Sequence, residues 1–306
     1  MKRSPGKPLR RKWLWIVNIL GLLGLGIGSY LFSFYNDFTI MMDEIYEPIV
    51  RSASPLYVVE KAQLDEKDPF SLLLLGVDER EGDRGRSDTM LVLTVNAKLQ
   101  TTKMVSIPRD TYTEIIGRGT MDKLNHAYAF GGIEMSMASV EHLLDIPIDY
   151  VAQINMEGFK DIVDSVNGVR VENALAFDSF PAGVIHLSGE DALEFVRMRM
   201  EDPRGDFGRQ DRQKQVIRGI IDQGLSMNSL VSYKDIFNAL GPNLRTNMTF
   251  NEMMEVRKHY SEAFESIEQL PVQDGYGVME DGTWYYLMDE EELRGIQEVL
   301  KEHLEM

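Results

Sequence analysis

The sequence predicts an α/β sandwich with a mixed β-sheet, preceded by one N-terminal transmembrane helix. Two observations predict it: an apolar run at residues 13–35, and short strand-like and helical patterns that alternate from residue 68 onward. The chain has 306 residues, of which 43% are hydrophobic, so it can bury a substantial core. Without cysteine, disulfide frameworks and thiolate metal sites are excluded.

The N-terminus has the pattern of an uncleaved signal anchor. Residues 1–12 contain six cations and no acid, and residues 13–35 would form a helix of about 34 Å, enough to cross a hydrocarbon core of about 30 Å. A cleaved signal peptide is the alternative, but its apolar region is normally only about 7–15 residues long. The positive charge predicts a cytoplasmic tail at 1–12, a single span at 13–35 and an extracellular remainder, which places the protein in the cell membrane. Residues 36–67 are interpreted as a stem.

The outer domain is predicted to occupy residues 68–306 and to begin with three strands. The run at 69–78 is short and continuously apolar, as in a strand buried on both faces, and further strands are predicted at 89–98 and 103–111 with a hairpin between them. Next come a helix over 131–144, a strand over 150–156 and a helix over 156–166. The Asn167-Gly168 pair is a left-handed stop for that last helix.

The second half of the domain repeats this alternation. Short strands are predicted at 168–173 and 183–189, and a helix at 189–199. A second helix is predicted to begin at Arg209 and run to Gly224, with a buried face formed by Val216, Ile217, Ile220 and Ile221. The Asp281-Gly282 pair indicates a hairpin turn, and Asp289 with Glu292 marks the start of a final helix.

Charge limits the partners and identifies an unusual stretch. The net charge of −17 argues against general nucleic-acid binding, which needs a basic face. Yet residues 197–213 contain five arginines. An acidic chain that gathers arginine so densely is expected either to pair it locally with acids or to use it for an anion.

Two aspartates are candidate metal ligands. Asp78 follows the first predicted strand and Asp88 begins the next, so the two carboxylates would converge if these strands are neighbours. Oxygen ligands without histidine or cysteine favour Mg²⁺, with Mn²⁺ as an alternative. The position at a strand's carboxyl end is also where open α/β sheets bind ligands. The competing interpretation is a solvated charged loop.

Candidate anion-binding arginines lie at two further places. Arg109 ends the third predicted strand, and Arg209 lies one helical turn before Gln213 on the same face. Guanidinium groups beside a helix N-terminus suit a phosphate. Alternatively, the arginines pair with Glu201, Asp202, Asp206 and Asp211, and we expect such pairs for Arg204 and Arg212. Together, the carboxylates and arginines describe a pyrophosphate site.

Five motifs, in this order, resemble the LytR-CpsA-Psr family: GVDER…RSDT, SIPRDT, DKLNHAYAFGG, DYVAQINMEGF with NGV, and VRMR…DFGRQDRQ. The resemblance covers about residues 68–260 and is closest to the wall teichoic acid transferases of Gram-positive rods. It implies an α/β/α sandwich with a hydrophobic tunnel for a polyprenyl tail. It also implies Mg²⁺-dependent transfer of a glycopolymer from undecaprenyl pyrophosphate to the C6 hydroxyl of N-acetylmuramic acid in peptidoglycan, forming a phosphodiester. The expected partners are this lipid-linked glycopolymer, peptidoglycan and membrane lipid.

The resemblance also implies roles for individual residues. Asp78 and Asp88 would hold Mg²⁺, and Arg109 would stabilise charge rather than act as a base, because a guanidinium pKa exceeds about 12. Asp78, Asp88 and Asp110 stay open as the general base. Leu72 to Leu75, Phe130, Met135 and Phe159 would line the tunnel, although core packing is an equal alternative for each. The residues expected to contact the pyrophosphate are Arg80, Arg86, Arg109, Arg197, Arg199, Arg209 and Gln213.

Two other function classes remain. A Mg²⁺-dependent pyrophosphatase would use the same residues with water as acceptor. A non-catalytic membrane regulator of transcription would need a cytoplasmic domain that acts on the transcription machinery, and only about 12 residues are predicted to lie in the cytoplasm. The sequence does not identify the glycopolymer, because the pyrophosphate linkage is common to several.

Overall fold

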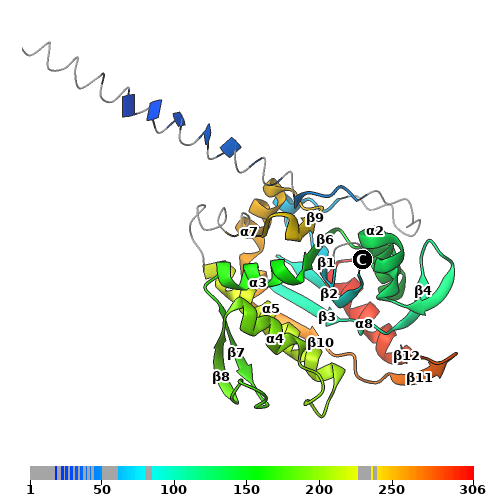
Figure 1. The fold of residues 1–306 in the computed structure, drawn as a ribbon. Coiled ribbons are helices and arrows are strands. Elements are labelled where there is room, and N and C mark those ends of the chain that lie inside the picture. The colour runs from blue at the N-terminus through cyan, green and yellow to red at the C-terminus, as the bar shows by residue number, and fades with distance from the viewer. Residues whose placement is uncertain are drawn as a thin grey trace, which may run out of the picture. The chain divides into compact units, whose positions relative to one another are not determined.

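The computed structural model describes residues 45–49, 61–79, 85–226 and 240–306, together with Ile236 and single positions between Asn18 and Met42 (Figure 1). The chain divides into two compact units, Met1–Glu44 and Ile45–Met306. Most of the predicted span at 13–35 lies outside the described residues. No helix within the described part is both long and apolar enough to span a membrane. Leu64, from the segment predicted as a stem, is buried in the core of the second unit.

A mixed six-stranded sheet forms the centre of the second unit, in the order β10-β3-β2-β1-β6-β9. Neighbouring β1 and β2 are antiparallel, as are β2 with β3 and β6 with β9, whereas β1 with β6 and β3 with β10 are parallel. This confirms the predicted mixed sheet. The strands are β1 (Phe70–Val77), β2 (Ser87–Asn96), β3 (Thr101–Ser106), β6 (Tyr150–Asn155), β9 (Leu244–Thr246) and β10 (Ile267–Leu270).

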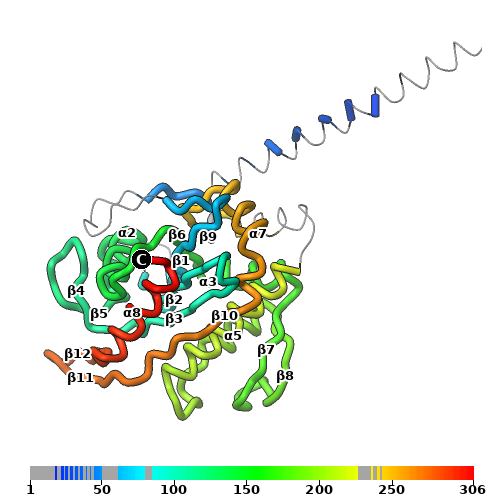
Figure 2. Tube along the Cα trace, turned by 180° about the vertical axis from the view of Figure 1, so that it is seen from behind, coloured from blue at the N-terminus to red at the C-terminus, as the bar shows by residue number. Residues whose placement is uncertain are grey.

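Helices cover both faces of this sheet (Figures 1 and 2). On one face, Leu73 and Val77 of β1 pack in one core cluster with Met137 of α2 (His126–Leu144) and Leu300 of α8 (Glu290–His303). On the other face, Leu91 and Leu93 of β2 pack with Tyr260 of α7 (Phe250–Glu265), and α5 (Asp206–Ser226) contributes to the same cluster. The result is a three-layer arrangement in which α2 and α8 lie opposite α5 and α7.

A third core cluster joins α3 (Met156–Ser165), α4 (Gly189–Arg197) and α5 to a hairpin of β7 (Val169–Asn173) and β8 (Gly183–Leu187). The predicted left-handed stop is confirmed, because Asn167 has φ 63° and Gly168 φ 78°. α4 begins at a capping box in which Ser188 and Asp191 satisfy each other's backbone N–H groups. α5 begins at Asp206, three residues before the predicted start, so Arg209 lies within its first turn.

Two smaller hairpins complete the unit. β11 (Tyr276–Glu280) and β12 (Thr283–Leu287) are joined by the predicted turn, in which Asp281 has φ 46° and Gly282 φ 78°. β4 (Tyr112–Ile115) pairs with β5 (Thr120–Lys123), a hairpin that the sequence analysis did not predict, as it did not predict β9 or β10. Asp289 accepts the N–H groups of Glu291 and Glu292 and caps α8, as expected.

The first strand differs from its prediction in one respect. Leu73, Leu75 and Val77 are buried in the core, as predicted. Leu72 and Leu74 on the alternate face are only partly buried and border a cavity. The alternate face of the apolar run therefore both packs against the helices on its side and borders a cavity.

Candidate active site

Asp78 and Asp88 are brought together by an irregularity between β1 and β2. Val77 pairs with Ser87 and Gly76 with Thr89, so Asp88 is an extra residue at a β-bulge. The backbone N–H of Asp78 donates to the carbonyl of Arg86 at 3.1 Å and closes the connecting segment. Gly85 is required there, because it has φ 70° and a Cβ would lie 2.0 Å from the Asp78 carbonyl oxygen. The predicted convergence of the two aspartates is thus built into the local backbone.

Two cavities meet at this aspartate pair. One has a volume of about 360 Å³ and is walled mainly by apolar side chains from β1, β6, α3 and α5. The other has a volume of about 540 Å³ and is walled mainly by charged and polar side chains. Asp78 and Asp88 line both cavities. The carboxylates therefore lie at a boundary between an apolar and a polar space.

The apolar cavity uses some of the residues predicted for a tunnel. Leu72, Leu74, Leu75 and Phe159 line it, and so does the face of α5 that had been predicted to be buried, through Ile217, Ile220 and Ile221. Leu73 faces the packed core instead. Phe130 and Met135 do not border this cavity. The Phe130 ring lies under the Arg118 guanidinium, 3.8 Å from the ring centroid.

The predicted arginines are distributed around the boundary. Arg86 and Arg109 line the polar cavity, while Arg197, Arg209 and Gln213 line the apolar one together with the two aspartates. Arg199 borders neither cavity, but its Nε lies 3.8 Å from the Asp206 carboxylate, which also holds Arg209. Arg80 lies outside the described residues.

Arg109 is held firmly in its charged form. Its Nη1 donates to Asp88 Oδ1 at 2.7 Å, and its Nε lies 3.6 Å from Asp110 Oδ2. Burial alone would lower the pKa of Arg109, but the negative charges of Asp88, Asp110 and Asp206 raise its pKa above the ordinary value. Arg109 is therefore suited to stabilising negative charge and not to accepting a proton.

Arg209 lies in a region of crowded positive charge. Its Nη2 lies 2.7 Å from Asp206 Oδ1. Burial lowers the pKa of Arg209, the positive charges of Arg109 and Arg199 lower it further, and the nearby aspartates only partly oppose this. A bound anion would relieve this mutual repulsion between Arg109, Arg199 and Arg209.

Asp206 is supported by a short hydrogen-bond chain that sequence reasoning missed. Gln210 Nε2 donates to Asp206 Oδ2 at 3.1 Å, and Ser106 Oγ donates to Gln210 Oε1 at 3.0 Å. Ser106 and Gln210 are both buried. The four-residue spacing of Asp206 and Gln210 on a helix was a signal in the sequence, but only the fold places Ser106 of β3 against them.

The local ion pairs predicted for the arginine-rich stretch are confirmed. Arg212 Nη1 donates to Asp202 Oδ2 at 2.6 Å, and Arg204 Nη1 donates to Asp211 Oδ2 at 2.5 Å. These arginines are engaged by the protein itself. Arg209 and Arg199 share the Asp206 carboxylate, so these two arginines are also paired with a local acid.

The polar cavity contains further residues to which no role had been assigned. Lys123, Asn125 and His126 line it beside Asp110. Lys123 Nζ donates to Asp110 Oδ1 at 2.8 Å, and His126 Nδ1 lies 2.9 Å from Asp122 Oδ2. One oxygen of Asp110 is therefore already occupied by a lysine.

The two aspartates fit a hard cation in the chemistry of their ligand atoms. Within the described ranges, no group of three or more His, Cys, Asp or Glu side chains is arranged to hold a metal ion. Asp78 and Asp88 offer carboxylate oxygens, as Mg²⁺ prefers, and a site of one or two carboxylates is normally completed by phosphate oxygens and water. A bound cation at this pair would thus be shared between the protein and an anionic ligand.

The model of the LytR_cpsA_psr family matches residues 32–302. The chain belongs to the LytR-CpsA-Psr family. It is 46% identical over 309 residues to the polyisoprenyl-teichoic acid–peptidoglycan teichoic acid transferase TagU of Bacillus subtilis, covering all of both chains. The crystal structure of B. subtilis TagU is similar with a TM-score of 0.65 and 48% identity, over 78% of this chain and 98% of that one. A structure of TagT bound to LI-WTA matches with a TM-score of 0.72 and 32% identity, over 85% and 100% of the two chains.

Proposed function

We propose that this LytR-CpsA-Psr protein is a phosphotransferase that moves an anionic glycopolymer, wall teichoic acid, from a polyprenyl-pyrophosphate carrier to peptidoglycan. The observation that carries the proposal is the position of Asp78 and Asp88 at the boundary between an apolar and a polar cavity. A lipid pyrophosphate has the same division, with a hydrocarbon tail joined to a charged head. The relatives named teichoic acid transferases support the choice of polymer.

The apolar cavity would receive the polyprenyl tail as the inner part of a lipid tunnel. Its walls are mainly apolar side chains from both the sheet and the helices, and its charged and polar lining residues include Asp78, Asp88, Arg197, Arg209 and Gln213. A signal anchor at residues 13–35 would hold this domain at the outer face of the cell membrane. There the protein would meet its lipid-linked donor by diffusion in two dimensions.

The pyrophosphate would lie at the cavity boundary against the arginine cluster. Arg109 and Arg209 would stabilise its charge from fixed positions, with Arg86, Arg197, Arg199 and Gln213 around them and Arg80 as a further contact. Fixed guanidinium groups cost no reorganisation when charge develops, so they stabilise a phosphoryl-transfer transition state more than the ground state. Asp88 and Asp206 keep Arg109 and Arg209 in place before the donor binds.

The reaction exchanges one oxygen for another on a single phosphorus. The C6 hydroxyl oxygen of N-acetylmuramic acid forms a bond to the phosphorus that carries the glycopolymer, and the bond from that phosphorus to the bridging oxygen breaks. The bridging oxygen keeps the electron pair and leaves as polyprenyl monophosphate, while the hydroxyl proton passes to a base. Asp78, Asp88 and Asp110 are all candidates for that base: Asp110 already binds Lys123, and Asp88 already binds Arg109.

Asp78 and Asp88 would also hold Mg²⁺, which would neutralise charge on the pyrophosphate oxygens. If both aspartates bind the cation, the acceptor proton passes first to solvent or to a substrate oxygen. Metal dependence and the position of the base are therefore separate questions, and a metal titration answers only the first.

The test uses the full-length protein in detergent with Mg²⁺, a short-chain prenyl-pyrophosphate teichoic acid precursor, and uncrosslinked peptidoglycan oligomers. We expect labelled glycan on muramic acid, with kcat reduced by about 10²–10³ in Arg109→Ala and in Asp88→Ala, the range for loss of one charge-stabilising group. Arg118→Ala is the matched control, since Arg118 is exposed and borders neither cavity.

The same assay separates the other function classes. Release of glycan phosphate without attachment to the acceptor would identify a pyrophosphatase. Tight binding of the lipid donor without turnover under any acceptor condition would favour a non-catalytic regulator. Equal turnover in Arg109→Ala and Arg118→Ala would refute the assigned role of the arginine cluster.

A further inference from the structure

The β11–β12 hairpin is attached to the wall of the polar cavity. The backbone N–H of Tyr286 donates to the carbonyl of Asp110 at 2.9 Å, and Asp110 lines that cavity. Lys123, from the same cavity wall, lies 5.8 Å from the ring centroid of Tyr285. An aromatic hairpin is therefore held directly beside the candidate active site.

One face of this hairpin presents an indole ring fixed in place. A Cβ on Gly277 would lie 2.5–2.9 Å from Nε1, Cε2 and Cζ2 of Trp284, so the ring lies close over the glycine backbone. Trp284 nevertheless remains 44% exposed, and Met279 opposite it in the ladder is 66% exposed. One side of the Trp284 ring thus packs on the hairpin backbone, and the rest of the ring remains accessible to solvent.

This face continues toward a third cavity. Tyr286 lies two residues beyond Trp284 on the same side of β12, about 7 Å along the strand. The centroid of the Tyr286 ring is 6.0 Å from that of Phe207, the exposed second residue of α5. Phe207 in turn borders a cavity of about 370 Å³ between α5 and residues 270–273. Trp284, Tyr286 and Phe207 therefore form an aromatic row: Trp284 and Phe207 are its exposed ends, and Tyr286 between them is only 4% exposed and packs in the core.

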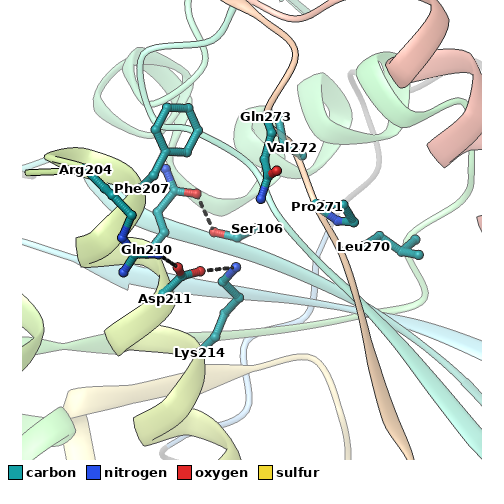
Figure 3. Close-up of a pocket in the computed structure, with 10 residues that line it drawn as sticks. All are labelled: Ser106, Arg204, Phe207, Gln210, Asp211, Lys214, Leu270, Pro271, Val272 and Gln273. Atoms are coloured by element: carbon teal, nitrogen blue, oxygen red, sulfur yellow. Dashed lines mark hydrogen bonds and ion pairs between the residues drawn. The ribbon is translucent and has the colours of Figure 1, made fainter. Parts of the chain in front are cut away.

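The third cavity has a mixed lining (Figure 3). Phe207 and Gln210 extend from α5 toward Val272 and Gln273 on the facing segment. Arg204 and Lys214 both pair with Asp211, so these three charged side chains carry one net positive charge. The lining of the third cavity thus combines apolar surface, amide groups and a positive charge.

The wall between this cavity and the candidate active site is thin. Gln210 borders the cavity and donates to Asp206, and Asp206 holds Arg209 on the other side. A molecule seated in the cavity would lie next to the arginine cluster without occupying the lipid cavity. That is the relation expected between an acceptor and a donor that react at one centre.

We propose that the aromatic row and the third cavity form a binding subsite for the acceptor, an amino-sugar glycan strand that carries acidic peptides. The inference rests on the proposed transferase function. The apolar faces of sugar rings would stack on Trp284, amide side chains such as Gln273 would bind hydroxyl and acetamido groups, and Arg204 and Lys214 would attract the peptide carboxylates. An uncharged lipid or a basic partner matches this combination less well.

The test measures acceptor and donor separately with the full-length protein in detergent. We expect Trp284→Ala to raise the acceptor KM about tenfold, in the range of an interface hot spot, with the donor KM changed less than about twofold. Tyr276→Ala is the matched control, because Tyr276 is an aromatic residue on the opposite face of the same hairpin and is 61% exposed. Gln273→Ala probes the cavity without altering the hairpin strands and should raise the acceptor KM alone.

A binding measurement keeps this proposal separate from the transferase activity. The wild-type protein and each variant are sedimented with purified peptidoglycan stripped of attached polymers. Weaker sedimentation of Trp284→Ala and Gln273→Ala than of Tyr276→Ala supports the subsite even if no transfer occurs, in which case only the proposed function fails. Equal sedimentation and equal acceptor KM for all three variants, in a protein that does transfer, would overturn the subsite and leave the function intact. Loss of donor binding in Gln273→Ala would also overturn it.

Discussion

Two arginines three residues apart on α5 show how differently one residue type is used. Arg212 is buried with every nitrogen engaged: Nε donates to the carbonyl of Phe195, Nη1 to Asp202, and Nη2 to the carbonyl of Met198. Arg209 pairs with Asp206, but its buried Nε has no hydrogen-bond partner among the described residues. Buried polar atoms are rarely left without partners, so Arg209 differs from Arg212 in having an unsatisfied donor that a ligand would satisfy.

Arg109 follows the pattern of Arg209. Its Nη1 is bonded to Asp88, while its buried Nε also lacks a hydrogen-bond partner within the described part of the chain. The two incompletely bonded arginines come from separate segments and lie close enough for the charge of Arg109 to lower the pKa of Arg209. Completeness of hydrogen bonding therefore separates Arg212 from Arg109 and Arg209, the two arginines to which we assign anion binding.

The largest expected effect is on stability. Arg212→Ala leaves the buried Asp202 carboxylate without its main partner, and breaking a buried pair typically costs about 3–5 kcal/mol. We expect a large decrease in the free energy of unfolding by urea. Arg209→Ala, three residues earlier, should decrease it much less. Equal destabilisation by the two substitutions would remove the distinction between these arginines.

A comparably large effect is expected on catalysis. Arg209→Ala should lower kcat by about 10²–10³, because a fixed donor to the developing charge is lost. Arg209→Lys should recover only part of this, since an ammonium group lacks the planar fork of donors. Steady-state kinetics with the lipid-linked donor checks both. A kcat for Arg209→Ala close to that of the wild type would contradict the assignment.

A smaller effect should follow from loosening the support of Arg209. Gln210→Ala removes one hydrogen bond to Asp206, worth about 0.5–1.5 kcal/mol, so we expect kcat to fall by up to about tenfold with little change in the donor KM. Gln210→Glu keeps the length of the side chain but places a carboxylate beside Asp206, and it should lower kcat further. A change in donor KM without a change in kcat would argue against a positioning role.

The smallest expected effect is on how steeply the stability of the fold declines at acid pH. Burial alone would raise the pKa of Asp202, but its bonds to Arg212 and to the Arg204 backbone outweigh burial and hold the pKa below the ordinary 3.8. A carboxyl with a lowered folded pKa stabilises the fold above its unfolded pKa and loses this contribution as pH falls through the folded pKa. Asp202→Asn should therefore decrease stability near neutral pH and flatten its decline below about pH 4, measured by urea unfolding across pH.

Much of the local structure could be predicted because its causes are local. The strand at 70–77, the glycine stop after α3, the hairpin turn at Asp281 and the cap of α8 each depend on a few adjacent residues. The same holds for the pairs of Arg204 and Arg212, whose partners lie within ten residues. The placement of Asp78 and Asp88 could be predicted because one short loop joins their strands.

Other features depend on contacts between distant segments. The missed strands β9 and β10 each pair with strands far away in the sequence, and Ser106 meets Gln210 only because β3 passes beneath α5. Phe130 and Met135 have the composition of tunnel residues but lie elsewhere, because apolar character predicts burial and not which cavity or core a side chain faces.

By itself, the sequence determined the types of element, the net negative charge with its arginine-rich stretch, and the candidate ligands for a metal and an anion, since all of these follow from composition and short-range spacing. The tertiary structure alone decided which arginines have all their hydrogen bonds satisfied, which face of β1 borders a cavity, and how Trp284 and Phe207 line up beside the site. These depend on packing between segments that the chain order does not bring together, and packing sets the desolvation and the hydrogen-bond partners of every buried group.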